Sequence, residues 1–326
     1  MSNAVYAAAR ARSQEIYLIG EERLNRLVEC ATVNDAVKIL SETGFGKSVS
    51  EAAGADYESL IAAEKSALFD FIRETCAYPE ITHYLLAKSD YKNAEAFIKC
   101  KYLKLDADKL TDVSGLIAKE TLKEKILKDD YDELPKHMKD ALLYADEAFV
   151  SGTATGAGIS AAFEKAYFAD ICEVSKKNKY LSDLYAVKAD AANAGIALRT
   201  RNYAYAKNQF VKEGRLKEAD LKSLCEEPYD ALLGKYGRGD DKDFLTRAIT
   251  AAKNGKPLSD FERAAESFAV EYVKRDKYAT EGALPFLQYC LYKLADLANV
   301  RIILSGINGG ADKNEIRKRL RAYYER

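Results

Sequence analysis

The segment Asp90-Tyr91-Lys92-Asn93 recurs as Asp190-Ala191-Ala192-Asn193 and again as Asp296-Leu297-Ala298-Asn299. The flanks of the three segments also match. Apolar or small residues recur twelve, eight and four positions before each Asn, and one and five positions after it. In chain order these are Ile81, Leu85, Ser89, Ala94 and Ile98, then Leu181, Tyr185, Ala189, Ala194 and Leu198, then Leu287, Leu291, Ala295, Val300 and Leu304. Because these steps follow one face of a helix, the repeat predicts three copies of one helix with a small residue at the middle of its buried stripe.

The repeat predicts an all-α protein of three similar helical modules, which we place at residues 1–107, 108–213 and 214–326. Pro79 and Pro285 each lie 14 residues before a repeat Asn, where proline suits the first turn of a helix, whereas the second copy has Lys179 there. The chain lacks the sustained Val, Ile and Thr alternation between tight turns that strands would show. Three modules can stack in line or close around a pseudo-three-fold axis, and closure would leave a central cavity.

Composition limits the classes of partner. The 326 residues include 50 basic and 51 acidic ones, so the chain has no overall attraction for nucleic acid or anionic lipid. The six cysteines are far apart and form no Cys-x-x-Cys, which is typical of buried thiols in a reducing compartment. We find no signal-peptide core and no apolar run near the ~20 residues that span a bilayer. We therefore expect a soluble protein that meets a membrane only through another protein.

The repeat signature itself has two interpretations. Its members are Asp90, Asn93, Asp190, Asn193, Asp296 and Asn299. An Asp and an Asn three residues apart share a helix face, and their side chains can bind the backbone of a neighbouring segment. Because buried polar groups usually have structural partners, we favour a polar packing device at a helix crossing over a ligand site.

Two local patterns suggest chemistry, and each lacks necessary parts. Glu80-Ile81-Thr82-His83 has the Glu-x-x-His spacing of di-iron bundles, but such a site needs a second copy, and His137 has Leu134 three residues before it. The glycine-rich stretch at residues 152–160 resembles a phosphate loop, but no Lys follows its glycines and no strand precedes it. We therefore expect no metal site, no cofactor site and no catalytic residues, and a loop between helices at residues 152–158.

A basic cluster near the C-terminus also has two interpretations. Arg317, Lys318, Arg319 and Arg321 lie beside Ile316 and Leu320, which would fill the apolar side of a helix. The cluster is either a solvated helix face or a docking face for an acidic partner.

Taken in order, several segments resemble the C subunit of the prokaryotic V/A-type rotary ATPases, the counterpart of the d subunit of eukaryotic vacuolar ATPases. The resemblance covers essentially the whole chain. It rests on residues 6–12 with Glu15, residues 40–46, the first two repeat segments with Arg199 and Arg201, residues 285–289, residues 299–303 and residues 316–320. One departure lies in the third repeat, where the family pattern places Lys-Glu before the Asn, whereas here Lys293 is followed by Leu294-Ala295-Asp296.

The resemblance implies a fold and a role. Family members are funnels of three similar helical modules around a pseudo-three-fold axis, with a central cavity. The funnel would sit on the rotor ring of proteolipid subunits, at the cytoplasmic face of the membrane, and its cavity would receive the shaft formed by the D and F subunits. The protein would then be a non-catalytic component of the central stalk that couples ring to shaft.

Two other functions remain open on the residues alone. A helical binding scaffold of an unrelated complex fits the repeat equally well, and modules stacked in line would favour it. An all-α enzyme with a site of Asp, Glu and Tyr would need a deep pocket that holds carboxylates with raised pKa values.

Overall fold

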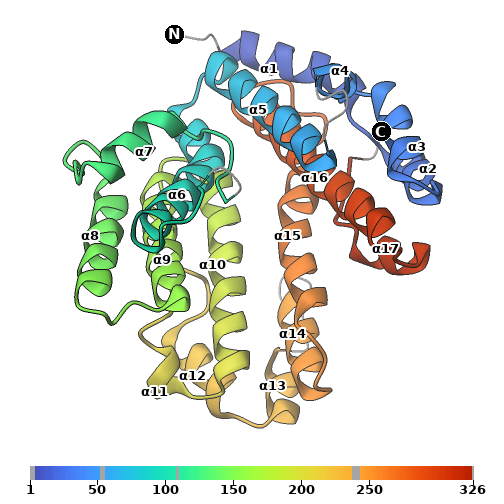
Figure 1. Ribbon diagram of the computed structural model, residues 1–326. Helices are drawn as coiled ribbons and strands as arrows, with labels where there is room; N and C mark the ends of the chain where they lie inside the picture. Colours follow the sequence, from blue (N-terminus) through green and yellow to red (C-terminus); the bar gives the residue numbers. More distant parts are fainter. Residues whose placement is uncertain (1–3, 52–55, 108–109, 237–242, 325–326) are drawn as a thin grey trace. The chain divides into compact units, whose positions relative to one another are not determined.

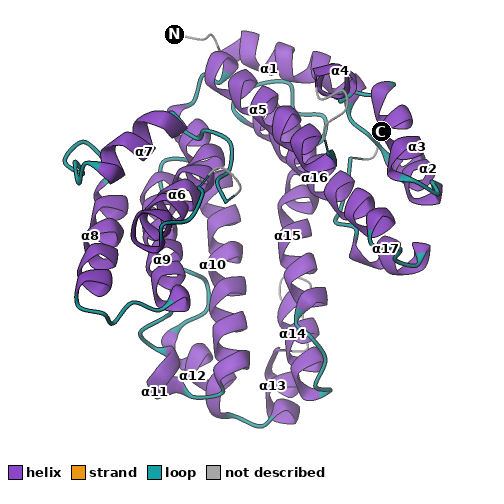
Figure 2. Cartoon of the chain, viewed as in Figure 1, coloured by secondary structure: helices purple, strands orange, loops and turns teal. Residues whose placement is uncertain are grey.

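The protein is all-α, as the sequence predicts. The computed structural model describes residues 4–51, 56–107, 110–236 and 243–324, and every regular element within these ranges is a helix. Figure 2 shows these helices joined by loops. In this described part of the chain, no helix is both long and apolar enough to cross a membrane.

The chain folds into two compact units. Unit 1 combines residues 1–78 with residues 240–326, and unit 2 contains residues 79–239. Unit 1 is therefore built from both ends of the chain, while unit 2 is continuous. These units differ from the three modules at residues 1–107, 108–213 and 214–326, and that division remains a prediction.

Unit 1 is organised around one long helix. Its helices are α1 (Ala4–Gln14), the 3-10 helix η1 (Glu15–Tyr17), α2 (Glu21–Glu29), α3 (Val33–Ser41), α4 (Gly46–Glu51), α5 (Tyr57–Thr75), α14 (Asp243–Lys253), α15 (Ser259–Lys274), α16 (Leu284–Asn308) and α17 (Lys313–Arg319). Helix α16 is buried on most of its faces, and α1, α5 and α15 pack against it (Figure 1). A helix that is apolar nearly all round must be covered on all sides, and the two chain ends supply that cover.

The N-terminal helix is held to the rest of unit 1 by polar contacts as well as by its buried alanines. The Arg12 guanidinium donates to the Ala279 carbonyl and, at 2.7 Å, to Gln288 Oε1. The Gln288 amide in turn donates to the Val273 carbonyl at 2.7 Å. The two bonds of Arg12 join segments more than 260 residues apart in the sequence.

Unit 2 contains the other two long repeat helices. Its helices are α6 (Pro79–Leu103), α7 (Lys119–Leu127), α8 (Lys136–Val150), α9 (Gly156–Ser175), α10 (Lys179–Thr200), α11 (Tyr203–Ala206), α12 (Glu218–Glu226) and α13 (Tyr229–Tyr236). Helices α6, α8 and α9 pack on one another, and α10 packs on α9 and α12 (Figure 1). Side-chain oxygens of Thr155 and Asn178 cap the N-termini of α9 and α10. The long helices thus begin where the sequence supplies a capping residue or, for α6, Pro79.

Candidate functional site

The first repeat pair lies in the middle of α6 and binds the loop that follows that helix. The Asp90 carboxylate accepts backbone N–H groups of Gly115 (3.2 Å), Leu116 (2.7 Å) and Ile117 (3.3 Å). The Asn93 amide accepts from the Asp112 N–H at 2.6 Å and donates to the Val113 carbonyl at 3.2 Å. We call such a pair, with the backbone it binds, a clamp. The α6 clamp ties the loop at residues 112–117 to the long helix.

The second pair forms a clamp of the same kind on α10. The Asp190 carboxylate accepts the Leu216 N–H at 2.8 Å. The Asn193 amide accepts the Val211 N–H at 2.8 Å and donates to the Val211 carbonyl at 2.9 Å. Asn193 thus satisfies both backbone groups of one residue, as a neighbouring strand would.

The third pair, on α16, uses both ends of the chain. The Asn299 amide accepts the Arg321 N–H at 2.8 Å and donates to the Arg321 carbonyl at 3.3 Å. The Asp296 carboxylate accepts the Ile19 N–H at 2.9 Å, across 277 positions of sequence. Its other oxygen, Oδ1, is buried and has no hydrogen-bond partner among the described residues.

A short helix begins just after the backbone that each Asp binds. Helix α7 follows Leu116, α12 follows Leu216, and α2 follows Ile19. The three clamps therefore share one local geometry: the middle of a long helix holds the segment that leads into a short helix. In the third clamp, the short helix comes from the opposite end of the chain.

The side chains of the three aspartates are buried. Burial raises the pKa of each carboxyl from the usual acidic range to about 6. Backbone N–H groups lower these pKa values, but less than burial raises them. A buried carboxyl held by backbone groups of its own chain is a structural feature, and a raised pKa at such a place does not by itself indicate catalysis.

Two glycines make room for the carboxylates. A Cβ on Gly115 would lie 2.5 Å from Asp90 Oδ1, and one on Gly214 would lie still closer to Asp190 Oδ1. Non-bonded atoms do not approach so closely, so either side chain would force its neighbour to move. The pattern of apolar residues around the repeat gives no sign of these glycines, because they lie in loops that follow the repeat helices.

A buried ion pair, also missed from the sequence, lies one turn from Asp296. The Lys293 ammonium is 2.6 Å from Glu64 Oε1 on α5, and both side chains are 6% exposed. Ser48 Oγ donates to Glu64 Oε2 at 2.5 Å, and the ammonium also lies over the Phe45 ring, 4.3 Å from its centroid. Each charge is thus paired and further solvated by protein groups, which a buried ion requires.

Both histidines have carboxylate partners in unit 2. His83 Nε2 lies 2.9 Å from Asp170 Oδ2, and His137 Nε2 lies 2.9 Å from Glu173 Oε1. Glu80, the acidic residue of the Glu-x-x-His pattern, is not the partner of either histidine. Within the described ranges, no group of three or more His, Cys, Asp or Glu side chains could hold a metal ion.

The glycine-rich stretch at residues 152–160 contains a turn and the start of a helix. Helix α8 ends at Val150 and α9 begins at Gly156, where Thr155 Oγ1 accepts the Gly158 N–H at 3.0 Å. The Ser160 hydroxyl, further along α9, bonds Glu95 and Lys99 of α6. A threonine of the chain itself thus caps this helix N-terminus. Residues 151–155 connect the two helices as the sequence predicts, whereas residues 156–158, predicted as loop, form the first turn of α9 because the Thr155 cap starts the helix there.

The basic cluster of α17 is paired largely within unit 1. Arg317 and Lys313 both bind Glu29 of α2, and these bonds lower the pKa of the Glu29 carboxyl. Lys318 pairs with Glu315, and Arg321 pairs with Glu266 of α15. Of the flanking apolar residues, Ile316 is buried, whereas Leu320 lies past the helix end and is only partly covered. Arg317 and Arg321 thus have carboxylate partners within this chain, and a docking role of the cluster stays a prediction.

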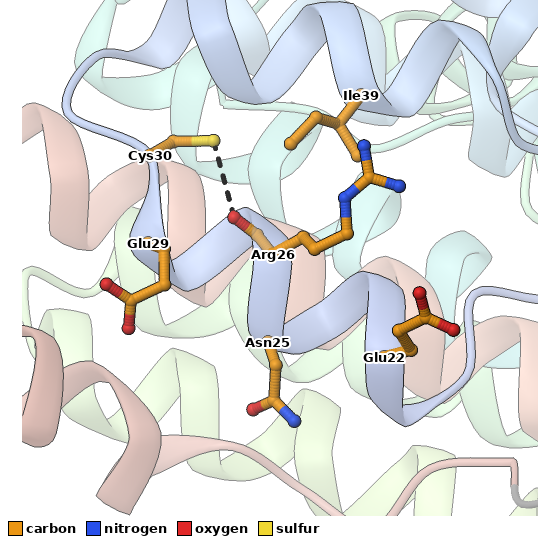
Figure 3. Close-up of a pocket in the computed structure, with 6 residues that line it drawn as sticks. All are labelled: Glu22, Asn25, Arg26, Glu29, Cys30 and Ile39. Atoms are coloured by element: carbon orange, nitrogen blue, oxygen red, sulfur yellow. Dashed lines mark hydrogen bonds between the residues drawn. The ribbon is translucent and has the colours of Figure 1, made fainter.

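A surface depression lies over α2 and α3 and includes Glu29, the partner of Arg317 and Lys313 (Figure 3). It is lined by Glu22, Asn25, Arg26, Glu29, Cys30 and Ile39. The Cys30 thiol donates to the Arg26 carbonyl at 3.5 Å, so it faces its own helix. Burial is the main cause of a raised pKa of this thiol, which makes it a poor nucleophile.

Comparison with known proteins gives a consistent result. Residues 7–319 match the family model described as ATP synthase (C/AC39) subunit. The chain is 26% identical to the C subunit of the A-type ATP synthase of Haloferax volcanii, over 98% of this chain and 97% of that protein. It is 19% identical to the C subunit of the V-type sodium ATPase of Enterococcus hirae, over 96% and 97% of the two chains. It is also 22% identical to the C subunit of the A-type ATP synthase of Methanocaldococcus jannaschii, over 97% and 85%.

Proposed function

The chain belongs to the ATP synthase (C/AC39) subunit family, and from that premise we propose that it is the part of the central stalk that couples the membrane rotor ring to the shaft of a V/A-type rotary ATPase. The observation that carries the proposal is the family match across residues 7–319, which include the Asp and the Asn of all three clamps. The chain and its relatives from Haloferax and Enterococcus also cover one another almost completely.

A subunit that couples a ring to a shaft must transmit torque without deforming. One ion that crosses 100 mV supplies ~2.3 kcal/mol, and this work reaches the catalytic head only as torque. A coupler that deforms would lose part of it. The clamps on α6 and α10 fix a connecting loop to the middle of a long helix, and the clamp on α16 fixes the segment after α17 in the same way, each through two or more backbone bonds. These segments therefore resist displacement.

The arrangement of partners is part of the same proposal. Three modules close around a pseudo-three-fold axis, the base of the resulting funnel binds the ring of proteolipid subunits, and the cavity receives the D and F subunits. The protein then lies on the cytoplasmic face of the membrane without entering it. A socket of this kind can hold a shaft through a moderate contact area and still release it.

The chain itself performs no chemistry in this proposal, and it needs no cofactor. The most buried acidic groups, Asp90, Asp190, Asp296 and Glu64, bind backbone, Lys293 or Ser48. The purified chain should therefore hydrolyse no ATP above background. Turnover that co-purifies with the chain and disappears on mutation of one of these acids would favour the enzyme interpretation.

The first test is a pull-down of the tagged chain from gently solubilised native membranes, with the bound proteins identified by mass spectrometry. We expect both shaft subunits and the ring protein. If neither is recovered although both are present in the extract, the chain is a helical scaffold of another complex.

The second test separates coupling from simple membership. A complex assembled without this chain should retain ATP hydrolysis in its catalytic head and lose ATP-driven ion transport into vesicles, and added chain should restore transport. If transport is normal without the chain, the coupling role is wrong even when the pull-down succeeds.

A further inference from the structure

The segment after α17 lies against two helices of unit 1 without forming a helix itself. Residues 320–324 follow the end of α17 and have no regular secondary structure. We call these five residues the strap. Asn299 of α16 binds both backbone groups of Arg321, as in the third clamp. The Ala322 N–H donates to Ser267 Oγ of α15 at 3.0 Å. Backbone hydrogen bonds thus fix the strap to both helices.

The tyrosine side chains of the strap contact the same two helices. The ring centroid of Tyr324 lies 5.1 Å from that of Tyr292 on α16, and Tyr292 is only 2% exposed. The Lys274 ammonium of α15 lies over the ring of Tyr323, 5.8 Å from its centroid. A tyrosine that packs on a buried ring contributes both apolar area and an aromatic contact. The strap is therefore held as a bound peptide would be, by its backbone and by two side chains.

The strap also meets the N-terminal part of unit 1. A Cβ built on Gly20 would lie 3.9 Å from the carbonyl oxygen of Tyr324. Tyr292 lies near both segments, because burial first, then the charge of Glu15 and then Tyr324 raise the pKa of Tyr292 to about 12. If the strap left α16, Tyr292 would become accessible to water, and residues 15–20 would lose a neighbour on one side.

The strap is held more weakly than the helix before it. Helix α17 has its own anchors, since Ile316 is buried and both Lys313 and Arg317 bind Glu29 of α2. Every residue of the strap is only half-buried, and its backbone hydrogen bonds are part-exposed, so water can replace them. Segments with few buried contacts open at a lower free energy than the core. The strap can therefore leave α15 and α16 while α17 stays in place.

We propose that the strap is releasable, and that the surface of α15 and α16 beneath it is a binding site for an extended peptide that ends in two adjacent tyrosines. The chain fills this site with its own residues 320–324. Release of the strap loosens residues 15–20, while α5, α16 and unit 2 remain folded. A segment of another protein with the same chemistry must displace the strap before it binds. This device is independent of the role of the chain in a rotary complex.

The first test is hydrogen exchange with mass spectrometry on wild type, a chain that ends at Arg319, the full-length variant Tyr324→Ala and the control Tyr205→Ala. Tyr205 is 67% exposed and lies in unit 2. In the truncated chain, we expect protection of peptides that cover residues 15–20 to fall about tenfold, with α5 and α6 unchanged. Tyr324→Ala should lower the same protection about threefold, and the control should not change it.

The second test measures the binding site directly. A fluorescein-labelled peptide of residues 320–326 is titrated with each protein, and binding is followed by fluorescence polarisation. The peptide should bind the truncated chain at least about tenfold more tightly than wild type, whose own strap occupies the site. The same peptide with Tyr324→Ala should bind the truncated chain about tenfold more weakly. Excess unlabelled peptide should restore the protection of residues 15–20 in the truncated chain.

Four results would overturn the proposal. Equal binding of the peptide to the truncated chain and to wild type would rule out the site. Full protection of residues 15–20 in the truncated chain would rule out the link to the N-terminal segment. If truncation also removes the protection of α5, the strap is an integral part of unit 1 and is not releasable. In the full-length chain, a loss of protection in Tyr324→Ala no larger than that in Tyr205→Ala would contradict the link without any truncation.

Discussion

The α10 clamp in unit 2 and the α16 clamp in unit 1 use the same two side chains, but they differ in the segment that the aspartate binds. Asp190 and Asn193 bind backbone 18 to 26 residues further along the chain. Asn299 also binds a following segment, but Asp296 binds Ile19, 277 residues away. One signature in the sequence thus forms a local loop in unit 2 and joins both chain ends in unit 1. Because closing a longer loop costs more entropy, the third clamp depends more on the packing around it.

The packing around the two clamps differs at one position in particular. Six residues before the repeat Asn, α6 and α10 bury Ala87 and Val187, whereas α16 buries Lys293. Its charge has Glu64 as partner, and Glu64 also holds Ser48 of the N-terminal part of unit 1. The clamp that closes the chain ends is therefore accompanied by an ion pair that the local clamps lack.

The largest effect should come from breaking this ion pair. Lys293→Met leaves the Glu64 carboxylate buried without its cation, so we expect the free energy of unfolding to fall by ~3–5 kcal/mol. Urea unfolding followed by circular dichroism measures it. The double variant Lys293→Val with Glu64→Leu, which copies the apolar α10 clamp, should recover most of the loss. A loss below ~1 kcal/mol in Lys293→Met would show that the pair adds nothing to unit 1.

The next largest effect should come from replacing the clamp asparagines with Ala. The loss of stability should be larger where the backbone that the asparagine binds is more deeply buried. Asn193→Ala leaves the buried N–H and carbonyl of Val211 without partners, at a cost of ~2–3 kcal/mol. The backbone bound by Asn93 and Asn299 is partly exposed, so water can replace those bonds and Ala should cost ~1–2 kcal/mol there. Thermal unfolding of the three variants tests the ranking, and equal losses would contradict the dependence on burial.

A smaller effect should follow from filling the space beside a local clamp. Gly115→Ala places a methyl group against the Asp90 carboxylate, which must rotate away from its backbone donors, so we expect a loss of ~1–2 kcal/mol. Gly234→Ala in α13 is the matched control because a Cβ there meets no atom within 4 Å. It should leave stability unchanged or raise it by up to ~1 kcal/mol, through higher helix propensity. A control as unstable as Gly115→Ala would point to a general intolerance of added methyl groups.

The smallest effect per residue should be the pH dependence that the aspartate of each clamp contributes to stability. The folded pKa of each Asp is about 6, above the unfolded value, so the native state binds more protons between pH 4 and 6. Stability should therefore rise by ~1 kcal/mol per Asp as the pH falls from 7 to 5, and Asp296→Asn should remove the share of that residue. Urea midpoints across this range measure the slope. If Asp296→Asn keeps the full slope, the raised pKa of Asp296 does not contribute to the pH dependence.

The sequence predicts where the clamp side chains lie on their helices, because the apolar and small residues around them repeat with helical spacing. The steps of 4, 4, 5 and 4 residues place Asp90, Asp190 and Asp296 at the middle of long helices, and each lies in a helix of at least 22 residues. The small residues four positions before each Asn, Ser89, Ala189 and Ala295, are all buried as the pattern predicts. The prediction for the basic cluster was partly wrong. Ile316 is buried on α17 as expected, but Leu320 lies past the end of that helix and does not complete its apolar side.

What the sequence alone determined is the all-α class, the family and the register of the repeat, since helical periodicity and residue order are properties of a single chain. Only the tertiary structure decided which backbone each clamp binds, that Lys293 needs Glu64, and that both histidines meet α9. These contacts join residues from 18 to 277 positions apart, with the Lys293–Glu64 pair among the long-range ones. No local pattern encodes them, because they arise when the burial of apolar faces brings distant segments together and each buried polar group must then find a partner.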